Sequence, residues 1–409
     1  MKEIYTQTDK STTLSISNNQ VHSVRNKTIA STGLRVYKKD CIGVAGAQGK
    51  VDLKELEKKA DEMLKMKISY PYAPGKENKV KVERKINLPA DFDLTLETNE
   101  IIDGIVKEQP DFILSHQISL HEVESSLSNE QGLDLMYRDS FLGIGLVFKE
   151  KSSANIMDGY YGYAGRDYDR KLFIDSYLKI LKAYKTKVDL PEKKTLPVVF
   201  SCDGAILAKL NSDLNGLQIG TGSSLLTSYL GKDKFHKDLT IWQSNNPDDG
   251  LLPFFDMEGT VNPDYRVALI ENGKILKGYT DKKVAAKYNL PYTGCASGSY
   301  DSIPKLGQAA LQLKPSQKTL KELLNGELGV YVYISSGGDF TSNGEYGAPV
   351  QLAFLTDGEN LLGRLPELSI GSHLFDMFGK DYIGVSSDKI YPHDFAYYLA
   401  MDMKVSKIY

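Results

Sequence analysis

The chain of 409 residues is long enough for two domains, and its content of 41% hydrophobic and 25% charged residues is ordinary for a globular protein. A net charge of −3 provides no overall positive field, so the composition argues against a nucleic acid or an anionic membrane surface as partner. The cysteines Cys41, Cys202 and Cys295 are far apart, so no disulfide framework is expected and a reducing compartment is favoured.

We expect neither a secretory leader nor a membrane span. The first residues, MKEIYTQTDKSTT, lack the apolar stretch of a signal peptide. No segment approaches about 18 consecutive apolar residues, the length that a spanning helix needs. These features predict a cytoplasmic protein.

The first 48 residues predict two antiparallel hairpins. TTLSISNNQVHSVRN (12–26) alternates apolar and polar positions on both sides of an Asn18-Asn19 turn. GLRVYKKDCIGVAGA (33–47) repeats the pattern around the polar turn KKD. Period-two alternation of this kind is typical of strands with one buried face.

Two helices follow the hairpins. Residues 51–66 have Asp52 as N-cap, Glu55 at capping-box spacing and an apolar stripe on one face. Residues 96–110 predict a second helix, weakened by Gly104. The Lys-rich stretch between them, YPYAPGKENKVKVERK (70–85), is expected to be a solvated loop.

The segment HEVESS (121–126) begins like a zinc-protease helix but has serine at both positions where a second histidine would be needed. It lies in a stretch, 112–150, that predicts two extended strands joined by the turn SNEQG. On a strand, residues four apart are separated by about 13 Å, which is too far for two zinc ligands on one helical turn. We therefore interpret His121 as a polar strand residue that faces solvent.

The Tyr-rich segment DGYYGYAGRDYD (158–169) is expected to be a packed loop, with peptide or base contacts as the alternative. Residues 166–187 predict a long helix with an apolar stripe. The polar stretch after this helix predicts a linker and a domain boundary near 186–196. This places an N-terminal α+β domain at 1–190 and a C-terminal, mainly β domain at 191–409.

The second half predicts many short strands. LPVVFS (196–201) is a strand, and a short helix is expected to follow from an Asp203 N-cap. Asn272-Gly273 and Asp357-Gly358 are typical hairpin turns. The predicted class is α+β, with an antiparallel sandwich or a partly closed barrel in the C-terminal part.

Few residues suggest chemistry on their own. The six histidines show no metal spacing on a predicted helix. Cys202 or Cys295 could form a nucleophilic site with a distant histidine, although a buried structural thiol is the usual role of a free cysteine. Asp256 and Glu258 in FFDMEGT could form an acid/base pair on one side of a strand, or anchor a turn.

Several segments together resemble the TldD/PmbA family. FFDMEGTVNPDYRVALIENGKILKGYTDKKVAAKYNLPYTGCASG is similar to the central family block with its D-x-E-G motif and hairpin. GGDFTSNGEYGAPV and PELSIGSHLFDMFGKDYIGVSSD resemble the blocks that follow it. STGLRVYKKDCIGVAGA and SSLSNEQG resemble N-terminal family patterns. The resemblance extends from about residue 10 to residue 405, in conserved order and spacing along the chain.

The resemblance also implies which branch of the family is the more similar. TldD-type chains carry a HExxxH zinc motif on a helix after an apolar strand, and PmbA (TldE)-type chains lack it. The matching place here is PVVFSCDGAILAKLNSDLNG, which has no histidine around residues 209–214. The chain thus resembles the PmbA branch, with no cofactor of its own and zinc expected in a TldD-type partner.

This family resemblance implies proteolysis of short or unfolded peptides, with the PmbA-type chain completing an enclosed chamber. The family is also labelled as modulating DNA gyrase, but no residue pattern here points to DNA. We expect the glycine-rich loops at Gly294, Gly298, Gly337 and Gly338, with Asp339, to contact peptide. Two alternatives stay open: a non-enzymatic, peptide-binding homodimer that pairs a peptide along an exposed strand edge, and an autonomous hydrolase that uses Cys295 or the Asp256/Glu258 pair.

Overall fold

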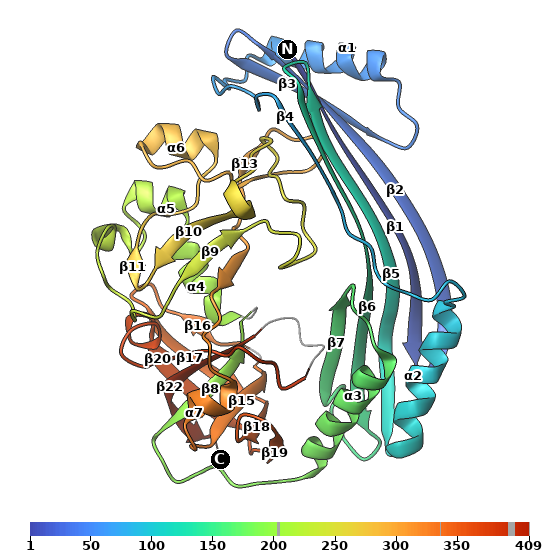
Figure 1. Ribbon diagram of the computed structural model, residues 1–409, viewed down its shortest axis with the longest axis vertical. Helices are drawn as coiled ribbons and strands as arrows, with labels where there is room; N and C mark the ends of the chain where they lie inside the picture. Colours follow the sequence, from blue (N-terminus) through green and yellow to red (C-terminus); the bar gives the residue numbers. More distant parts are fainter. Residues whose placement is uncertain (203–204, 336, 392–396, 409) are drawn as a thin grey trace.

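The computed structural model describes residues 1–202, 205–335, 337–391 and 397–408. Figure 1 shows a long, curved sheet from the N-terminal half, drawn in blue to teal, facing a more compact C-terminal half drawn in yellow to red. Both halves combine helices with mainly antiparallel sheets. The predicted α+β class is therefore confirmed.

The N-terminal sheet has seven strands in the order β3-β2-β1-β5-β6-β4, with β7 paired to β6. All of its pairs are antiparallel except that between β4 and β6. The predicted hairpin turns are confirmed, because Asn18 and Asn19 adopt positive φ angles of 50° and 64°, as a two-residue turn requires. The strands are β1 (Lys2–Ser17), β2 (Gln20–Lys38), β3 (Cys41–Gln48), β4 (Asn78–Glu83), β5 (Phe112–Asn129), β6 (Leu133–Glu150) and β7 (Gly159–Gly165).

Two segments that we expected to be loops are strands. In β4, Val80 and Val82 alternate with lysines and pack partly buried against the sheet, so the alternation outweighs the high lysine content. In β7, Tyr161 and Tyr163 are buried while β6 provides the hydrogen-bonding edge. The β4 prediction was wrong because its pairing with β6 is a long-range effect that local composition does not reveal. The β7 prediction was wrong because its Gly- and Tyr-rich composition suggested a loop, although it pairs with the preceding strand β6.

Helix α1 (Leu53–Met63) covers β2 and β3 with Leu56 and Ala60. Its predicted N-cap is confirmed, since Asp52 accepts a hydrogen bond from the Lys54 amide at 2.9 Å. Glu55 does not make the capping-box contact that its spacing predicts. Glu55 instead forms an i,i+4 ion pair with Lys59 at 2.8 Å.

Helices α2 (Leu94–Glu108) and α3 (Arg170–Lys185) pack against each other, and both predictions are confirmed to within two to four residues at each end. Gly104 has a packing role in α2, because a Cβ atom there would lie 2.8 Å from Ile174 of α3. The cluster around α3 includes apolar residues of both halves of the chain, so α3 lies between the two large sheets.

The C-terminal half contains an open nine-stranded sheet and a smaller four-stranded one. The large sheet runs β16-β17-β20-β22-β8-β15-β18-β19, with β21 paired to β22; the small one runs β11-β10-β9-β14. The large-sheet strands are β8 (Thr195–Ser201), β15 (Gly329–Ile334), β16 (Asp339–Phe340), β17 (Glu345–Val350), β18 (Leu352–Thr356), β19 (Leu361–Arg364), β20 (Leu368–His373), β21 (Tyr382–Val385) and β22 (Tyr398–Lys407); the others are β9 (Ile241–Ser244), β10 (Arg266–Glu271), β11 (Lys274–Ile275), β14 (Leu311–Leu313) and the pair β12 (Ala296–Ser297) and β13 (Lys305–Leu306).

Both predicted hairpins of this half are confirmed. Asn272 and Gly273, with φ of 49° and 81°, join β10 to β11, and the loop with Asp357 and Gly358 joins β18 to β19. The predicted helix after β8 forms as α4, whereas its expected N-cap, Asp203, lies outside the described residues. The short helices here are α4 (Ala208–Asp213), α5 (Gly216–Thr221), α6 (Lys282–Tyr288), α7 (Leu320–Leu324) and α8 (Leu374–Met377).

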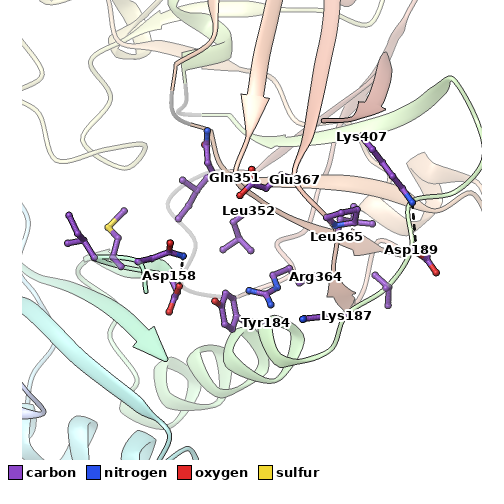
Figure 2. Close-up of a pocket in the computed structure, with 16 residues that line it drawn as sticks. Asp158, Tyr184, Lys187, Asp189, Gln351, Leu352, Arg364, Leu365, Glu367 and Lys407 are labelled. Carbon is purple, nitrogen blue, oxygen red and sulfur yellow. Dashed lines mark hydrogen bonds and ion pairs between the residues drawn. The ribbon is translucent and has the colours of Figure 1, made fainter. Parts of the chain in front are cut away.

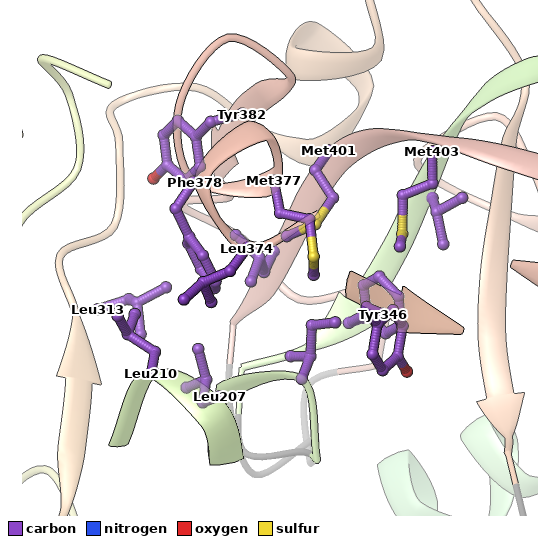
Figure 3. Packing of buried hydrophobic residues seen from close by; sticks show 14 of the residues in the cluster. Leu207, Leu210, Leu313, Tyr346, Leu374, Met377, Phe378, Tyr382, Met401 and Met403 are labelled. Atoms are coloured by element: carbon purple, nitrogen blue, oxygen red, sulfur yellow. The ribbon is translucent and has the colours of Figure 1, made fainter. Parts of the chain in front are cut away.

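The C-terminal core lies between the large sheet and these short helices. Figure 3 shows Met377, the last residue of α8, beside Met401 of β22, with Phe378, Met403 and Leu210 of α4 in the same cluster. The methionines fill the irregular space where short helices meet a sheet. This packing includes Leu210 of α4 and Leu313 of β14, the strand that borders the candidate site.

The segment between α3 and β8 runs along the edge of the large sheet. The Val188 amide donates to the Arg364 carbonyl at 3.0 Å, and the Arg364 amide donates to the Thr186 carbonyl at 2.6 Å. The segment therefore acts as a short extra strand beside β19. The division into domains at 190/191 stays a prediction.

Within the described chain, every helix is too short or too polar to cross a bilayer.

Candidate functional site

Two adjoining cavities lie between the N-terminal sheet and the C-terminal half. The first, of about 240 Å³, is lined by Tyr5 of β1 and by loops around residues 252–257, 294–298 and 307–310. The second, of about 530 Å³, extends from residues 244–252 to Cys202 and the strand β14. Leu252 and Ala310 line both, so we call the two together the β14 cavities.

The first cavity brings together four of the predicted residues, Cys295, Asp256, Gly294 and Gly298. Gly337, Gly338 and Asp339 line neither of the β14 cavities and lie instead at β16, an edge of the nine-stranded sheet. The two glycine-rich loops thus belong to different parts of the C-terminal half. Their predicted contact with peptide remains a prediction.

Asp256 is buried and organises a turn. Its carboxylate accepts hydrogen bonds from the amides of Glu258 (3.0 Å), Thr260 (2.8 Å) and Ala296 (2.9 Å). Burial raises the pKa of the Asp256 carboxyl, while these amide donors lower it. The Asp256 side chain holds residues 256–260 against β12, which is the role of an anchored turn rather than of a strand.

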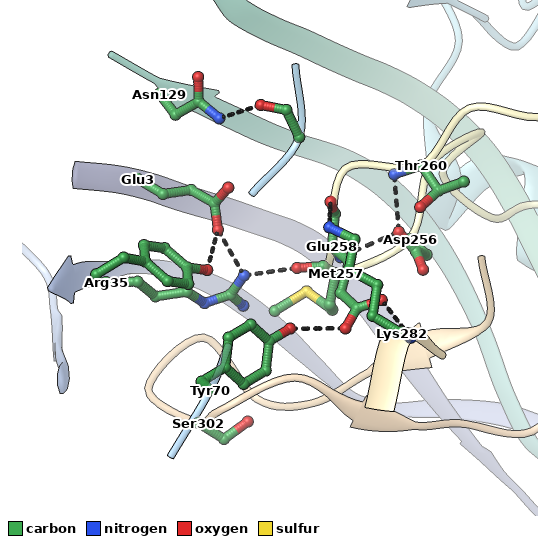
Figure 4. Close-up of polar contacts among 12 residues, drawn as sticks. Glu3, Arg35, Tyr70, Asn129, Asp256, Met257, Glu258, Thr260, Lys282 and Ser302 are labelled. Atoms are coloured by element: carbon green, nitrogen blue, oxygen red, sulfur yellow. Dashed lines mark hydrogen bonds and ion pairs between the residues drawn. The ribbon is translucent and has the colours of Figure 1, made fainter. Parts of the chain in front are cut away.

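Glu258 points the other way, toward the N-terminal half (Figure 4). Its carboxylate accepts hydrogen bonds from the Tyr70 hydroxyl at 2.6 Å, the Tyr292 hydroxyl at 3.1 Å and the Lys282 amide at 3.1 Å. Burial raises the pKa of the Glu258 carboxyl, and the nearby Asp256 raises it further. Tyr70 lies just before β4 in the N-terminal half, so its bond to Glu258 joins two residues that are 188 positions apart in the sequence.

A buried ion pair strengthens the same junction. Arg35 and Glu3, each 1% exposed, lie 3.0 Å apart through Nη1 and Oε1. The same Nη1 donates to the Met257 carbonyl at 2.5 Å, and the Tyr37 hydroxyl donates to Glu3 at 2.9 Å. We call these contacts, with those of Glu258, the domain joint (Figure 4).

Gly259 shows why the D-x-E-G motif ends in glycine. Its φ of 74° is a conformation that favours glycine, and a Cβ atom would lie 2.7 Å from Leu133 of β6. The turn therefore packs directly on the N-terminal sheet. In this chain the motif connects the two halves of the molecule.

Cys295 is 8% exposed, and burial raises the pKa of its thiol to about 12, with further contributions from Asp256 and Asp281. A nucleophilic cysteine requires the opposite, a thiolate stabilised by a neighbouring cation or helix N-terminus. The thiol packs as a small apolar group in the wall of the first cavity.

We expect iodoacetamide at pH 8 to alkylate Cys295 about thirtyfold more slowly than an ordinary thiol. A pKa about three units above the reference lowers the thiolate fraction about a thousandfold, and the higher nucleophilicity of a basic thiolate offsets only part of this loss. Timed alkylation with peptide mass spectrometry would compare Cys295 with the more accessible Cys41, and the Cys295 rate should rise steadily with pH. Equal rates for the two cysteines would contradict the raised pKa of Cys295, and a faster rate at Cys295 would identify an activated thiol.

β14 is the part of the site that sequence reasoning missed. It forms the edge of the four-stranded sheet, and the residues on either side of it bond to β9 and its flank. The Ser244 amide donates to the Ala310 carbonyl, and the Lys314 amide donates to the Thr240 carbonyl. In an antiparallel ladder the intervening residues face outward. Leu311 and Leu313 therefore direct backbone N–H and C=O groups toward the second cavity, and no described backbone group pairs with them.

Helix α4 occupies the place where the resemblance puts a zinc motif. Lys209 and Asp213 form an i,i+4 ion pair at 2.9 Å, and Asp213 also accepts from the Leu225 amide at 3.1 Å. Leu210 and Leu214 are fully buried in the core. A lysine ammonium has no lone pair for a metal, so these residues do not fit a zinc ion.

The histidine of HEVESS lies on β5, which confirms the predicted strand. Its ring stacks on Phe141 with centroids 4.8 Å apart, and Nε2 lies 2.8 Å from the Ser119 hydroxyl. Burial lowers the pKa of His121. Over the residues that the structure describes, no three His, Cys, Asp or Glu side chains gather in a metal-binding arrangement.

Comparisons with protein families match both ends of the chain. The model of the PmbA/TldA metallopeptidase C-terminal domain matches residues 193–406, and that of PmbA/TldA metallopeptidase domain 1 matches residues 3–67. Among curated proteins, no sequence matches this chain.

Solved structures share the fold at low sequence identity. TldE from Thermococcus kodakarensis superimposes with a TM-score of 0.82 at 17% identity, covering 99% of this chain and 96% of its own. A Thermotoga maritima protein whose name proposes that it modulates a DNA gyrase gives 0.80 at 14% identity, with coverage of 99% and 96%. A similarly named Bacteroides thetaiotaomicron protein gives 0.72 at 13% identity, with coverage of 100% and 94%. The fold is shared over the whole chain.

Proposed function

Because the chain belongs to the PmbA/TldD family and its fold is TldE-like, we propose that it is the zinc-free subunit of a cytoplasmic peptidase. In this proposal a TldD-type partner holds the zinc ion, which activates water for cleavage of short or unfolded peptides. The present chain completes the chamber and aligns the peptide. Its family membership and the residues of α4 together support this division of labour.

The observation that carries the proposal is the ion pair of Lys209 with Asp213 in α4. Asp213 is 2% exposed, so its charge needs a partner, and Lys209 supplies it. In α4, the helix after β8, Lys209 and Asp213 are thus paired with each other, and Leu210 packs in the apolar core. Metal chemistry in the assembly then falls to the partner chain.

The proposed task of this chain is to bind an extended peptide along β14. Leu311 and Leu313 offer the donors and acceptors for a fifth antiparallel or parallel strand, which is how many domains recognise extended peptides. Small residues at 294–298 and 307–310 let a peptide backbone approach the adjoining wall closely. Affinity from main-chain bonds suits unfolded substrates of varied sequence.

Backbone N-methylation gives a direct test of this alignment. A peptide paired with β14 forms hydrogen bonds through the N–H groups of every second residue. N-methylation of the residues that face β14 should therefore weaken binding about tenfold or more. The same number of methyl groups on the alternate residues, whose N–H groups point away from β14, should have little effect. Isothermal titration calorimetry on the purified chain would measure both. Equal weakening by both sets of methyl groups would contradict strand pairing.

Activity tests the whole proposal. The chain, a TldD-type zinc subunit and their equimolar mixture are assayed on the same unstructured peptides. We expect no cleavage by this chain alone and a large gain on mixing. Cys295→Ser serves as a matched control that should preserve the gain, because the thiol is protonated and packed. Equal activity in the solo and mixed samples would contradict the proposal.

A second candidate function is peptide binding without catalysis by a homodimer. The open edge of β14 favours it to the same degree, because strand pairing needs no zinc. The two functions differ in their partner: the homodimer predicts a symmetric dimer, with peptide affinity unchanged by a TldD-type chain and no cleavage on mixing. The geometry gives an autonomous hydrolase no comparable support, because amide donors occupy Asp256 and Cys295 is protonated.

A further inference from the structure

A third and larger cavity lies at the segment that links α3 to β8. Its volume is about 810 Å³, within the range of small-molecule sites. Its walls come from the loop 155–158, the end of α3, residues 187–189 and the β19 flank at 364–367 (Figure 2). It shares no lining residue with the β14 cavities, and we call it the linker pocket.

Two cations in this pocket have no carboxylate partner. The Arg364 guanidinium lies over the Tyr184 ring, 4.0 Å from its centroid, which holds it in place without neutralising it. Lys187, on the adjoining strand-like segment, is exposed. Across the described part of the chain, no acidic group lies within ion-pair distance of either side chain.

The acidic residues of the pocket make no ion pair with Arg364 or Lys187, although Asp158 interacts with the Tyr184 hydroxyl inside the pocket. Asp158 accepts hydrogen bonds from the Glu150 amide (2.7 Å), the Ser153 hydroxyl (2.7 Å) and the Asn155 amide (3.0 Å). Asp189 lies 3.9 Å from Lys407. The third, Glu367, is exposed to solvent. The three carboxylates keep their charge and balance Arg364, Lys187 and Lys407, so the pocket is neutral overall. Arg364 and Lys187, which have no ion-pair partner among the described residues, provide a local site for an anion on their side of the pocket.

The same pocket exposes apolar side chains. Ile156 is 97% exposed and Met157 is 44% exposed, whereas Leu352 at the base of the pocket is buried. An isoleucine so fully hydrated gains from any ligand that covers it. A ligand that fills the pocket therefore meets positive charge at Arg364 and Lys187 and an apolar wall at Ile156, Met157 and Leu352.

We infer that the linker pocket binds an organic anion with one carboxylate on an apolar body. Arg364 would take the carboxylate in the two-pronged geometry of a guanidinium, and Lys187 would add a second charge. The body would cover Ile156 and Met157. Two sources share this chemistry, a free monocarboxylate and the carboxyl terminus of a peptide that ends in apolar residues. The inference does not depend on the proposed peptidase role.

Calorimetric titration of the full chain tests the inference with three probes: octanoate, acetyl-leucyl-phenylalanine and the C-terminal amide of that dipeptide. We expect one-to-one binding of at least one carboxylate probe at concentrations near 1 mM and none of the amide. Arg364→Gln should weaken binding about tenfold or more, and Lys187→Gln about threefold. Arg25→Gln and Lys65→Gln, at exposed positions of β2 and beyond α1, are matched controls that should change nothing.

The Lys187→Gln and Ile156→Asp variants should fold normally, because both side chains are exposed, so a loss of binding in them cannot be attributed to misfolding. Ile156→Asp should also weaken binding, through lost apolar cover and added negative charge. Binding of octanoate alone points to a free acid, and binding of the dipeptide alone to a peptide terminus. No saturable binding of either carboxylate, or equal affinity of the Arg364→Gln and Arg25→Gln variants, would overturn the inference.

Discussion

Replacement of Arg35 by methionine is expected to lower the free energy of unfolding by about 3–5 kcal/mol, because it leaves the Glu3 carboxylate buried without its cation. Glu3 is 1% exposed and would keep only the Tyr37 hydroxyl as donor. The Met257 carbonyl would lose its bond to Arg35 as well. Urea unfolding followed by circular dichroism measures the change, and scanning calorimetry shows whether the two halves then melt separately.

Two further variants separate charge from packing. Arg25→Met, on an exposed part of β2, removes an arginine without a buried partner and should be neutral within about 0.5 kcal/mol. The double variant Glu3→Gln/Arg35→Met should recover a large part of the loss, because the buried charge is gone. Arg35 Nε and Nη2 and Glu3 Oε2 have no hydrogen-bond partner among the described groups, so the pair is incompletely satisfied. A single Arg35→Met variant as stable as the parent would refute the domain joint.

Replacement of Asp256 by asparagine is expected to cost about 3 kcal/mol. The carboxylate accepts three backbone amides, and an asparagine amide group would turn an N–H donor toward at least one of them. The turn 256–260 would lose its anchor to β12, and the joint would loosen with it. The urea midpoint of the variant measures the effect.

The Asp256 variant also tests the acid/base hypothesis. If Asp256 and Glu258 were a catalytic pair, Asp256→Asn would keep the fold and remove an activity of the isolated chain. An anchored turn predicts the reverse, lower stability with no solo activity to lose. Asp61→Asn on the exposed face of α1 is the matched control and should leave stability unchanged. Stability equal to that of the control would count against the anchor.

The sequence predicts correctly those turns and helix ends that depend on interactions between residues close together in the chain. Asp52 at the start of α1, the Asn18-Asn19 turn and the Asn272-Gly273 turn each act within a few residues, and the structure has them as the sequence indicates. HEVESS also follows its alternation. The same approach fails for β4, because β4 depends on β6, which is far away in sequence. It also fails for β7, because the Gly- and Tyr-rich composition of β7 does not reveal its pairing with the preceding strand β6.

The domain joint could not be predicted for a related reason. The alternation of Leu34 and Val36 predicts one buried face, but Arg35 on the opposite face is equally buried. Helix α1 covers one face of this part of the sheet and the turn at Met257 covers the other, 222 residues away in sequence. The periodicity of the sequence predicts the face that α1 buries, but nothing in the sequence indicates that the turn at Met257 buries the other face.

The candidate site was predictable in part. The residue types pointed to Asp256, Glu258 and Cys295, and the family resemblance to the loop 294–298; the structure brings Asp256, Gly294 and Cys295 into one cavity. It separates them from Gly337 and Gly338 at β16. The open edge of β14 was not foreseen, because three residues of alternation, LQL, are too few to reveal a strand or its free side.

Metal content tests the central claim most directly. The chain is purified alone and in complex with a TldD-type subunit, dialysed against trace zinc, and analysed by elemental mass spectrometry. The ion pair of Lys209 with Asp213 predicts less than about a tenth of a zinc equivalent for this chain alone and about one equivalent per heterodimer, which would then be active. Near one equivalent in the isolated chain would contradict the account and make the chain a metallopeptidase in its own right.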